Sequence, residues 1–229
     1  MYRFASNDPL DCRDDVRMQG AVAGLRGQPR PADSPAPRDP PDPFGRPAPL
    51  ASSGRLAARL TESAADVAAA LALRHRVLAE EAGLVEVNDS GRDLDIFDPY
   101  CHHLIVRDQR SGRVVGTCRL LFPEAAGRVG SLFCDREFDL AALAGLRARL
   151  VEVGRLCIAP GYRDGMALML LWRALCRITR RHGHRYLIGC CSLANDPDGS
   201  LGANLHRQLG RHHAVAALQV TPTRRRAAA

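Results

Sequence analysis

The sequence predicts one α/β or α+β domain, in which helices and strands share one hydrophobic core. Two apolar strand segments are joined by a short turn containing glycine, and segments with helical apolar spacing lie on both sides of them. The chain has 229 residues, and a polar N-terminal part leaves roughly 160 to 170 of them for folding, which suits a single core.

The N-terminal part has the composition of a disordered segment. Residues 27–53 are dense in Pro, Ala, Asp and Arg and contain almost no large apolar side chain. Such a segment cannot bury enough apolar surface to offset the loss of chain entropy on folding. We therefore expect residues 1–55 to be disordered, residues 56–218 to form the folded domain, and residues 219–229 to be an Arg-rich tail.

The first expected helix runs from Ser63 to about Ala82. Ser63 and Asp66 resemble a capping box, with Asp in place of Glu. Apolar residues then recur at helical spacing, namely Val67, Leu71, Val77 and Leu78. A polar loop covers residues 86–101 before the next regular element.

The following elements predict a sheet with helical connections. Residues 103–107 and 113–121 are apolar strand segments that flank Ser111–Gly112, which predicts a β-hairpin. Beyond the hairpin we expect a helix over 138–149, a strand over 150–158, a helix over 166–182 and a strand over 185–191.

The strand over 150–158 contains the stretch VEVGRLCI (151–158). Alternation sends Val151 and Val153 to one face of the sheet and Glu152 to the other. Arg155 is three residues from Glu152, so in a regular strand the two side chains lie on opposite faces. We predict a β-bulge near Gly154, because one extra residue would bring Glu152 and Arg155 to the same face.

All 32 basic residues are arginine, and the formal net charge is +7. The arginines are concentrated towards the C-terminus, where residues 163–229 hold eleven Arg against three Asp. A basic region attracts nucleic acid, anionic lipid or an acidic carrier protein. We do not expect nucleic-acid binding, because no interleaved aromatic platform and no reading helix is apparent.

The eight cysteines are scattered without paired CxxC spacing, so the sequence predicts buried thiols instead of a zinc site or a disulfide framework. No other set of residues has the spacing of metal ligands, so no metal is expected. No run of about 18 apolar residues occurs, and the N-terminus lacks a signal-peptide pattern. We therefore expect a cytoplasmic protein without a membrane span.

A series of motifs over residues 56–195 resembles the ornithine-acyl-carrier-protein N-acyltransferases of ornithine lipid biosynthesis. These belong to the GNAT-like superfamily and are related to the acyl-homoserine-lactone synthases. The resemblance implies a GNAT-like fold, with a central mixed sheet, helices on both faces, and a splayed, bulged strand near Glu152–Arg155. The motifs that carry it are LRHRVLAEE (73–81), DLDIFD (93–98), HLIVRD (103–108), VVGTCRLL (114–121), REFDL (136–140), VEVGRLCIAPGYR (151–163) and LIGCCSL (187–193).

The resemblance also implies an active site. Glu152 is the candidate general base, acting through a water, and Arg155 is the second candidate catalytic residue. The acceptor substrate would be bound by residues that match a common superfamily pattern, namely Arg74, Asp93, Asp95, Asp98 and Arg119. The alternative is that all these side chains form a buried ion-pair network that only shapes the site.

On the donor side, the resemblance implies the acyl-phosphopantetheine of acyl carrier protein and no permanently bound cofactor. The loop of Arg163 and Gly165 is one residue short of the CoA-binding pattern of the superfamily, and it could equally be a simple strand-to-helix turn. Gly154 is the further donor-binding candidate, at the predicted bulge.

The helix over 166–182 carries a basic side that could dock an acidic carrier protein, although a solvated basic face is the alternative. Its arginines are Arg173, Arg177, Arg180 and Arg181. We expect Leu168, Leu171 and Trp172 of the same helix to lie in the core.

The expected function is transfer of a 3-hydroxyacyl chain from acyl carrier protein to the α-amine of ornithine, which forms lyso-ornithine lipid. Because the product is a lipid, peripheral contact with the inner face of the cytoplasmic membrane is also expected. Two alternatives stay open: an acyl-homoserine-lactone synthase that uses S-adenosylmethionine, and a truncated relative that binds carrier protein or lipid without turnover.

Overall fold

The computed structural model describes residues 2–3, 49–192 and 200–223. The chain divides into two compact units. The larger unit combines residues 1–10, 49–191 and 220–229 and contains the sheet and every candidate site residue. The other combines 11–48 with 192–219, and its described part contains helix α5 (Ser200–His212) and the 3₁₀ turn η5 (Ala216–Leu218).

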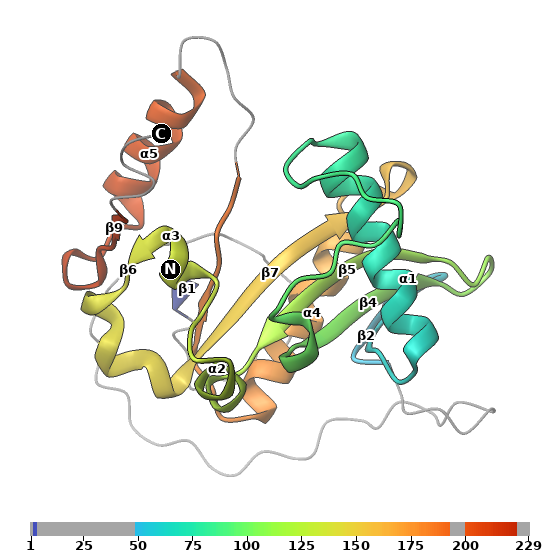
Figure 1. Cartoon of the computed structure of the whole chain (residues 1–229), viewed down its shortest axis with the longest axis horizontal. Helices are drawn as coiled ribbons and strands as arrows, with labels where there is room; N and C mark the ends of the chain where they lie inside the picture. The colour runs from blue at the N-terminus through green and yellow to red at the C-terminus, as the bar shows by residue number, and fades with distance from the viewer. Residues whose placement is uncertain (1, 4–48, 193–199, 224–229) are drawn as a thin grey trace. The chain divides into compact units, whose positions relative to one another are not determined.

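The described residues form a seven-stranded sheet with the order β1-β8-β7-β5-β4-β3-β2 (Figure 1). Neighbouring strands are antiparallel except β7 and β8, which are parallel, so the sheet is mixed. The strands are β1 (Tyr2–Arg3), β2 (Ala51–Ser53), β3 (Leu56–Leu60), β4 (His102–Asp108), β5 (Val114–Leu121), β7 (Leu150–Ile158) and β8 (Tyr186–Ile188). A second, two-stranded sheet pairs β6 (Phe138–Asp139) with β9 (Thr221–Pro222).

Three strands lie in segments for which no regular structure was expected. Strands β1 and β2 both fall within residues 1–55, where Tyr2–Arg3 pairs with β8 and Ala51–Ser53 pairs with β3. Strand β9 falls within the expected tail 219–229 and pairs with β6. The rest of the expected disordered segment, residues 4–48, and the end of the tail, residues 224–229, lie outside the described residues.

Helices cover both faces of the seven-stranded sheet (Figure 1). Helix α1 (Ala64–His75) contacts β4, β5 and β7 on one face, and α4 (Met166–Arg181) contacts β2, β3, β4, β5 and β7 from the other. The buried core combines apolar residues of both helices with those of the central strands, including Leu73, Leu170, Leu171, Leu175, Leu104, Ile105 and Val106. This architecture confirms the expected α/β class with a mixed sheet and helices on both faces.

Together, α1 and the π-helical segment that follows it span the expected helix, from Ala64 to Glu81. The Ser63 side chain accepts the Asp66 N–H at 3.1 Å, which satisfies one of the amides that a helix start leaves without a partner. The helix continues as a π-helical segment, η1 (Arg76–Glu81). The last turn of α1 thus places Arg74 inside the domain, where its side chain is fully buried.

Shorter elements connect the sheet strands. They are α2 (Pro123–Val129), α3 (Cys134–Glu137) and the 3₁₀ segments η2 (Asp98–Tyr100), η3 (Ala141–Arg149) and η4 (Pro160–Tyr162). The helix expected over 138–149 is therefore only partly present. Pairing with β9 keeps Phe138 and Asp139 extended, and the Asp139 side chain accepts the Ala141 N–H at 2.9 Å where the helical turns begin.

Strand β7 contains the predicted bulge. Thr117 pairs with Cys157 and Arg119 pairs with Gly154, so two β7 residues, Arg155 and Leu156, lie opposite the single residue Cys118. Arg155 has a φ of 53°, in the left-handed region that residues with a side chain rarely adopt. The extra residue directly follows Gly154, which confirms the prediction.

Strands β7 and β8 pair over a short stretch only. Their register covers Leu150 to Glu152 on β7, and β7 then continues to Ile158 without β8. This separation is the splay expected near Glu152. Just beyond the paired stretch, a Cβ atom on Gly189 would lie 2.5 Å from the Val153 carbonyl oxygen, so only glycine fits there without a shift of the backbone.

Candidate active site

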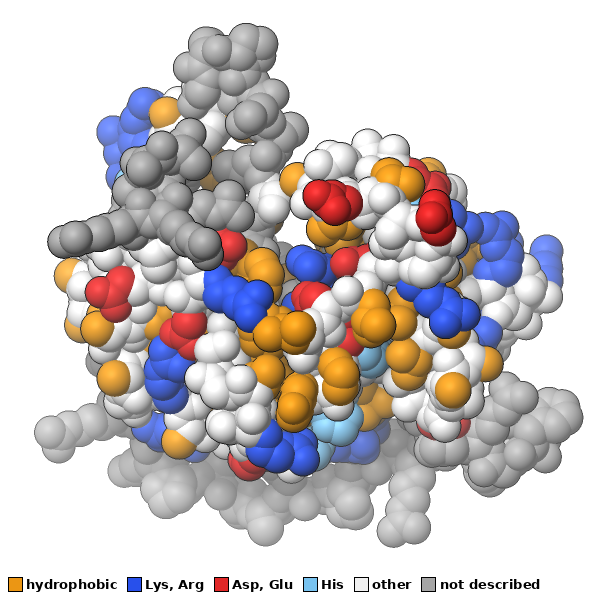
Figure 2. Space-filling model, in the orientation of Figure 1, with side chains coloured by type: hydrophobic (Ala, Val, Ile, Leu, Met, Phe, Trp, Pro, Cys, Tyr) orange, Lys and Arg blue, Asp and Glu red, His pale blue; other side chains and the backbone are white. Residues whose placement is uncertain are grey.

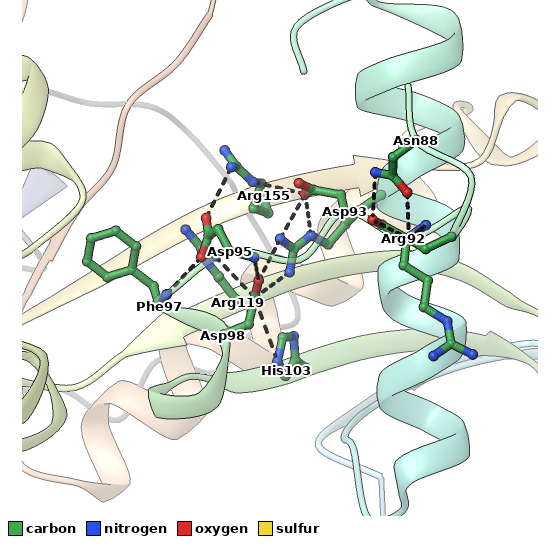
Figure 3. Close-up of polar contacts among 11 residues, drawn as sticks. Asn88, Arg92, Asp93, Asp95, Phe97, Asp98, His103, Arg119 and Arg155 are labelled. Carbon is green, nitrogen blue, oxygen red and sulfur yellow. Dashed lines mark hydrogen bonds and ion pairs between the residues drawn. The ribbon is translucent and has the colours of Figure 1, made fainter. Parts of the chain in front are cut away.

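Three aspartates and three arginines meet beside α1 and the central strands (Figure 3). Two of the aspartates come from the loop after η1 and the third begins η2, and the arginines come from α1, β5 and β7. Equal numbers of the two charges leave the cluster without net charge. This Asp–Arg network consists of Arg74, Asp93, Asp95, Asp98, Arg119 and Arg155, and it brings together all the expected acceptor-binding residues with Arg155.

The inner part of the network is buried and fully engaged. Arg74 Nε donates to Asp93 Oδ2 at 2.8 Å, while Nη1 and Nη2 donate to the two oxygens of Asp98 at 2.6 and 3.2 Å. Arg119 Nη1 donates to Asp98 Oδ1 at 3.1 Å and to Asp95 Oδ1 at 2.6 Å. Bidentate pairing of this kind fixes both partners, so Arg74 and Asp98 act as a rigid support for the rest.

The outer edge of the network consists of Asp95 and Arg155, whose side chains are 23% and 19% exposed, against 0% for Arg74. Arg155 Nη2 donates to Asp95 Oδ2 at 3.1 Å, and its Nε lies 3.0 Å from Asp93 Oδ2. Asp95 also accepts the Phe97 N–H at 2.9 Å. With Arg119, Asp95 thus accepts three hydrogen bonds, and a carboxylate offers about four acceptor positions. This edge is therefore partly open to solvent, and Asp95 retains about one acceptor position.

The surroundings set the protonation of the network. Burial by itself raises the pKa of Asp98, but the hydrogen bonds and charge of Arg74, the Asp95 N–H and the charge of Arg119 outweigh it and lower the pKa to about 2. His103 lies behind the network, with its Nε2 atom 3.9 Å from Asp98 Oδ1. Burial lowers the pKa of His103, which favours a neutral imidazole. Asp98 is therefore ionised at neutral pH, and the neutral form of His103 is favoured.

Glu152 lies outside the Asp–Arg network. Its Oε1 and Oε2 atoms accept the backbone N–H groups of Cys134 and Phe133 at 2.7 and 2.8 Å, at the start of α3, and the residue is 5% exposed. The alternative of an ion-pair network that includes Glu152 is thus not observed among the described contacts. The network and Glu152 nevertheless meet at Phe133, because the Arg155 guanidinium carbon lies 5.4 Å from the centre of the Phe133 ring.

Two phenylalanines lie at the candidate site that were not predicted from the sequence. The rings of Phe97 and Phe133 pack edge to face with centres 6.1 Å apart, and the Arg119 guanidinium carbon lies 5.6 Å from the Phe97 ring centre. They form an apolar wall beside the charged groups, and Figure 2 shows charged and apolar side chains next to one another near the middle of this face. Phe97 lies within the DLDIFD motif, which was a usable signal, whereas Phe133 lies in no recognised motif.

The donor-loop candidates lie at the start of α4. Arg163 Nη2 donates to Glu81 Oε2 at 2.8 Å, and its Nε donates to the Ile158 carbonyl at 3.0 Å, so this arginine ties the loop to η1 and β7. Gly165 has a φ of 97°, which suits a glycine at this turn. The Asp164 side chain accepts the Met166 N–H at 3.0 Å and thus occupies part of the helix N-terminus. At Gly154, a Cβ atom would contact only Arg119 Nε, at 3.7 Å.

The outer face of α4 is both basic and apolar. Arg173, Arg177, Arg180 and Arg181 are exposed, as expected. Leu168 and Trp172 were expected in the core but are 38% and 39% exposed, whereas Leu171 is buried as expected. The reason is helical geometry, since the sheet contacts the arc that contains Leu171 and leaves the neighbouring arc uncovered. Met169 is also exposed on this face.

The cysteines divide into two groups. Cys118, Cys134 and Cys157 are buried and Cys101 and Cys176 are partly buried, while Cys190 and Cys191 are exposed, which corrects the expectation of buried thiols for the last two. Cys12 lies outside the described residues. Burial raises the pKa of Cys101 and of Cys157 to about 12, so these thiols stay protonated at neutral pH.

The described residues contain neither a candidate metal site nor a helix that could cross a membrane. No group of three or more His, Cys, Asp or Glu side chains in the described part of the chain is arranged to hold a metal ion. Among the described helices, none is both long and apolar enough to cross a membrane.

The domain is similar to known proteins. Residues 73–173 match the family model of the acetyltransferase (GNAT) domain. The chain is also 35% identical over 142 residues to an L-ornithine N(alpha)-acyltransferase of Rhodobacter capsulatus, and 36% identical over 152 residues to one of Rhizobium meliloti. This chain is therefore similar to the GNAT domain over residues 73–173, and over the aligned residues it is similar to L-ornithine N(alpha)-acyltransferases. The range matched by the family model contains the whole Asp–Arg network and Glu152.

The alignments cover only part of each relative. The two alignments cover 58% and 61% of this chain and 55% and 51% of the relatives, so the chain spans about half the length of the curated relatives it matches. Among solved structures, the acyl-homoserine-lactone synthase LasI superposes with a TM-score of 0.45 and 18% identity, over 60% of this chain and 72% of that chain.

Proposed function

We propose that this protein is an N-acyltransferase that moves an acyl chain, expected to be 3-hydroxylated, from acyl carrier protein to the α-amine of ornithine. The product would be lyso-ornithine lipid. The observation that supports the proposal is the Asp–Arg network, whose exposed edge would suit a ligand with both a carboxylate and an ammonium group, in a domain similar to ornithine N(alpha)-acyltransferases.

The two groups at the outer edge suit a diamino acid. The Arg155 guanidinium would bind the acceptor carboxylate, because a guanidinium offers two parallel N–H groups to a carboxylate. The remaining acceptor position of Asp95 would bind the side-chain ammonium of ornithine. The buried pair of Arg74 and Asp98 would hold this edge in place, so that the α-amine is positioned for attack.

The reaction needs an amine without its proton. Glu152 would accept that proton through a water, since each of its oxygens accepts one backbone N–H and retains a lone pair. The amine nitrogen then forms a bond to the thioester carbonyl carbon, the carbon–sulfur bond breaks, and the phosphopantetheine thiol leaves. The bulge at Arg155 takes backbone groups of β7 out of the ladder, so one N–H there would stabilise the charge that develops on the carbonyl oxygen.

The donor would dock on the outer face of α4. Acyl carrier proteins are acidic, and Arg173 and Arg177 lie on this face beside the exposed Leu168, Met169 and Trp172. A mixed basic and apolar surface provides charge complementarity together with apolar area to bury. Arg163 and Gly165 would bind the phosphate of the phosphopantetheine arm, and Gly154 would lie beside the arm at the bulge. No cofactor would stay bound between turnovers.

Because the product is a lipid, we also propose peripheral contact with the inner face of the cytoplasmic membrane.

One assay tests the proposal. The purified full chain is incubated with 3-hydroxyacyl carrier proteins of several chain lengths and a mixture of ornithine, lysine, glutamine, glycine and S-adenosylmethionine, and the products are identified by mass spectrometry. We expect Nα-acylornithine as the main product. An acyl-homoserine lactone would instead identify a synthase of that class, and carrier-protein binding without any product would identify a non-catalytic relative.

A further inference from the structure

Two cysteine sulfurs lie next to each other beside Glu152. Cys134 Sγ and Cys190 Sγ are 3.4 Å apart without being bonded. A disulfide has a sulfur–sulfur distance of about 2.05 Å, so the two atoms need to approach by only about 1.4 Å to form one. Cys134 is buried at the start of α3, whereas Cys190 is exposed just after β8.

The two cysteines belong to the two segments that hold Glu152. The Cys134 N–H donates to Glu152 Oε1 at 2.7 Å. On the other side, Glu152 pairs with Ile188 of β8, two residues before Cys190. Between them, Gly189 packs closely against the Val153 carbonyl, which restricts the backbone that leads to Cys190. A bond between the two sulfurs would therefore link both supports of Glu152.

We propose that Cys134 and Cys190 are a thiol redox site that forms an intramolecular disulfide with a small oxidised disulfide such as glutathione disulfide. The Cys190 thiolate attacks one sulfur of the small disulfide, which releases one reduced thiol and leaves a mixed disulfide on Cys190. The Cys134 sulfur, after loss of its proton, then attacks Cys190 Sγ and displaces the second small thiol. One disulfide is reduced to two thiols, and the two protein thiols are oxidised to one disulfide.

The difference in exposure between Cys190 and Cys134 indicates which of the two thiols reacts first. A small oxidant in solvent can reach Cys190, which is exposed, but cannot reach the buried Cys134 directly. The hydrogen bond with Cys190 and burial both raise the pKa of the Cys134 thiol. Cys134 is thus a poor first nucleophile and acts as the resolving thiol, which makes the second step the slower one.

The chain offers a matched control for this site. Cys191 is the neighbour of Cys190 and is also exposed, whereas the sulfur that lies 3.4 Å from Cys134 Sγ is that of Cys190. The full chain is incubated at graded ratios of oxidised to reduced glutathione, quenched with an alkylating agent, and digested without reduction for mass spectrometry. We expect a peptide pair linked through Cys134 and Cys190, which disappears after treatment with a reductant.

The variants decide the assignment. Cys191→Ser should form the linked pair to the same extent as the wild type, whereas Cys190→Ser should lower it by at least tenfold. Because Cys190 and Cys191 are exposed, neither serine is expected to disturb folding, and thermal unfolding checks this. A wild-type chain that carries only glutathione on Cys190, or that links Cys134 to Cys191, would overturn the proposal.

The effect on activity rests on the proposed function and is measured separately. If Glu152 accepts the proton of the amine, a bond between its two supports should lower the rate of acyl transfer severalfold, and a reductant should restore it. A linked peptide without a change in rate would support the redox site and count against the role of Glu152. A protein without transfer activity would refute the proposed function but leave the peptide result valid.

Discussion

At the residue scale, Asp98 is the centre of the Asp–Arg network. Its two oxygens accept both terminal nitrogens of Arg74, and they also accept Arg119 and the Asp95 N–H at 3.1 and 2.7 Å. The removal of one partner from such a buried group leaves the opposite charge without compensation, which costs more free energy than the pair contributes over apolar residues of the same size.

The Asp98→Asn variant tests this centre. At pH 7 we expect it to lower the free energy of unfolding by roughly 3 to 5 kcal/mol. The folded-state pKa of Asp98 is about 2, below the ordinary 3.8, so its contribution is complete above pH 4 and is lost as the pH falls towards 2. Between pH 4 and pH 2, the difference in the free energy of unfolding between wild type and variant should therefore decrease by on the order of 2 kcal/mol. Denaturant unfolding at several pH values measures this, with Asp89→Asn at an exposed position as the control; a difference independent of pH would contradict the assignment.

At the element scale, β7 shows which parts of the site were predictable. The spacing of Glu152 and Arg155 conflicts with the period of two of a strand, and the conflict itself predicts the bulge that the register contains. The Asp–Arg network was also open to prediction, because the charged motifs recur in the order of a known family. The backbone partners of Glu152 could not be predicted. Phe133 and Cys134 lie in no recognised motif, and it is the path of the chain after α2 that brings their N–H groups to Glu152.

The backbone conformation of Arg155 at the bulge allows a separate prediction about stability. Arg155 has a φ of 53°, a conformation that costs a residue with a Cβ atom roughly 1 kcal/mol and that glycine adopts freely. Arg155→Gly and Arg155→Ala both lose the ion pairs, so their comparison isolates the backbone. We expect the free energy of unfolding of Arg155→Gly, measured with denaturant, to be about 1 kcal/mol higher than that of Arg155→Ala. An alanine variant of equal or greater stability would show that the left-handed conformation is not required.

The contact between β7 and the end of β8 makes a second prediction at this scale. A Cβ atom at position 189 would lie 2.5 Å from the Val153 carbonyl oxygen, whereas a Cβ atom at position 154 would meet only a side-chain atom at 3.7 Å. We expect Gly189→Ala to lower the free energy of unfolding by about 1 to 3 kcal/mol. Gly154→Ala is the matched control and should change it far less; equal losses would show that Gly189 is not in close contact with β7.

At the scale of the whole molecule, the surface of α4 shows that composition does not predict which side of a helix is buried. The excess of arginine in this helix was apparent from sequence, but the apolar residues exceed what one buried arc can hold. Sequence alone does not state which arc the sheet covers, and Leu168 and Trp172 prove to lie outside it. The domain bounds were limited in a similar way, since β2 and β9 are short strands stabilised by partners elsewhere in the chain.

The basic face of α4 carries the prediction for donor binding. Arg173→Glu should raise the KM for acyl carrier protein by roughly tenfold at low salt, because it replaces an attraction by a repulsion at the proposed interface. The kcat and the KM for ornithine should change little, and the difference should diminish as ionic strength rises. Arg110→Glu, at the exposed hairpin turn, makes the same change of charge elsewhere. Equal effects of the two substitutions would exclude a specific docking face.

The central claim is that the exposed edge of the Asp–Arg network binds the amino-acid acceptor of an acyl transfer. Its most direct test is kcat/KM for ornithine, with a 3-hydroxyacyl carrier protein as donor, in the wild type and in Asp95→Asn. We predict measurable transfer by the wild type and a loss of roughly 1.4 kcal/mol or more in Asp95→Asn, which is at least tenfold in kcat/KM, with the KM for the donor unchanged. Asp95→Asn with wild-type kcat/KM and an unaltered unfolding midpoint would contradict the account.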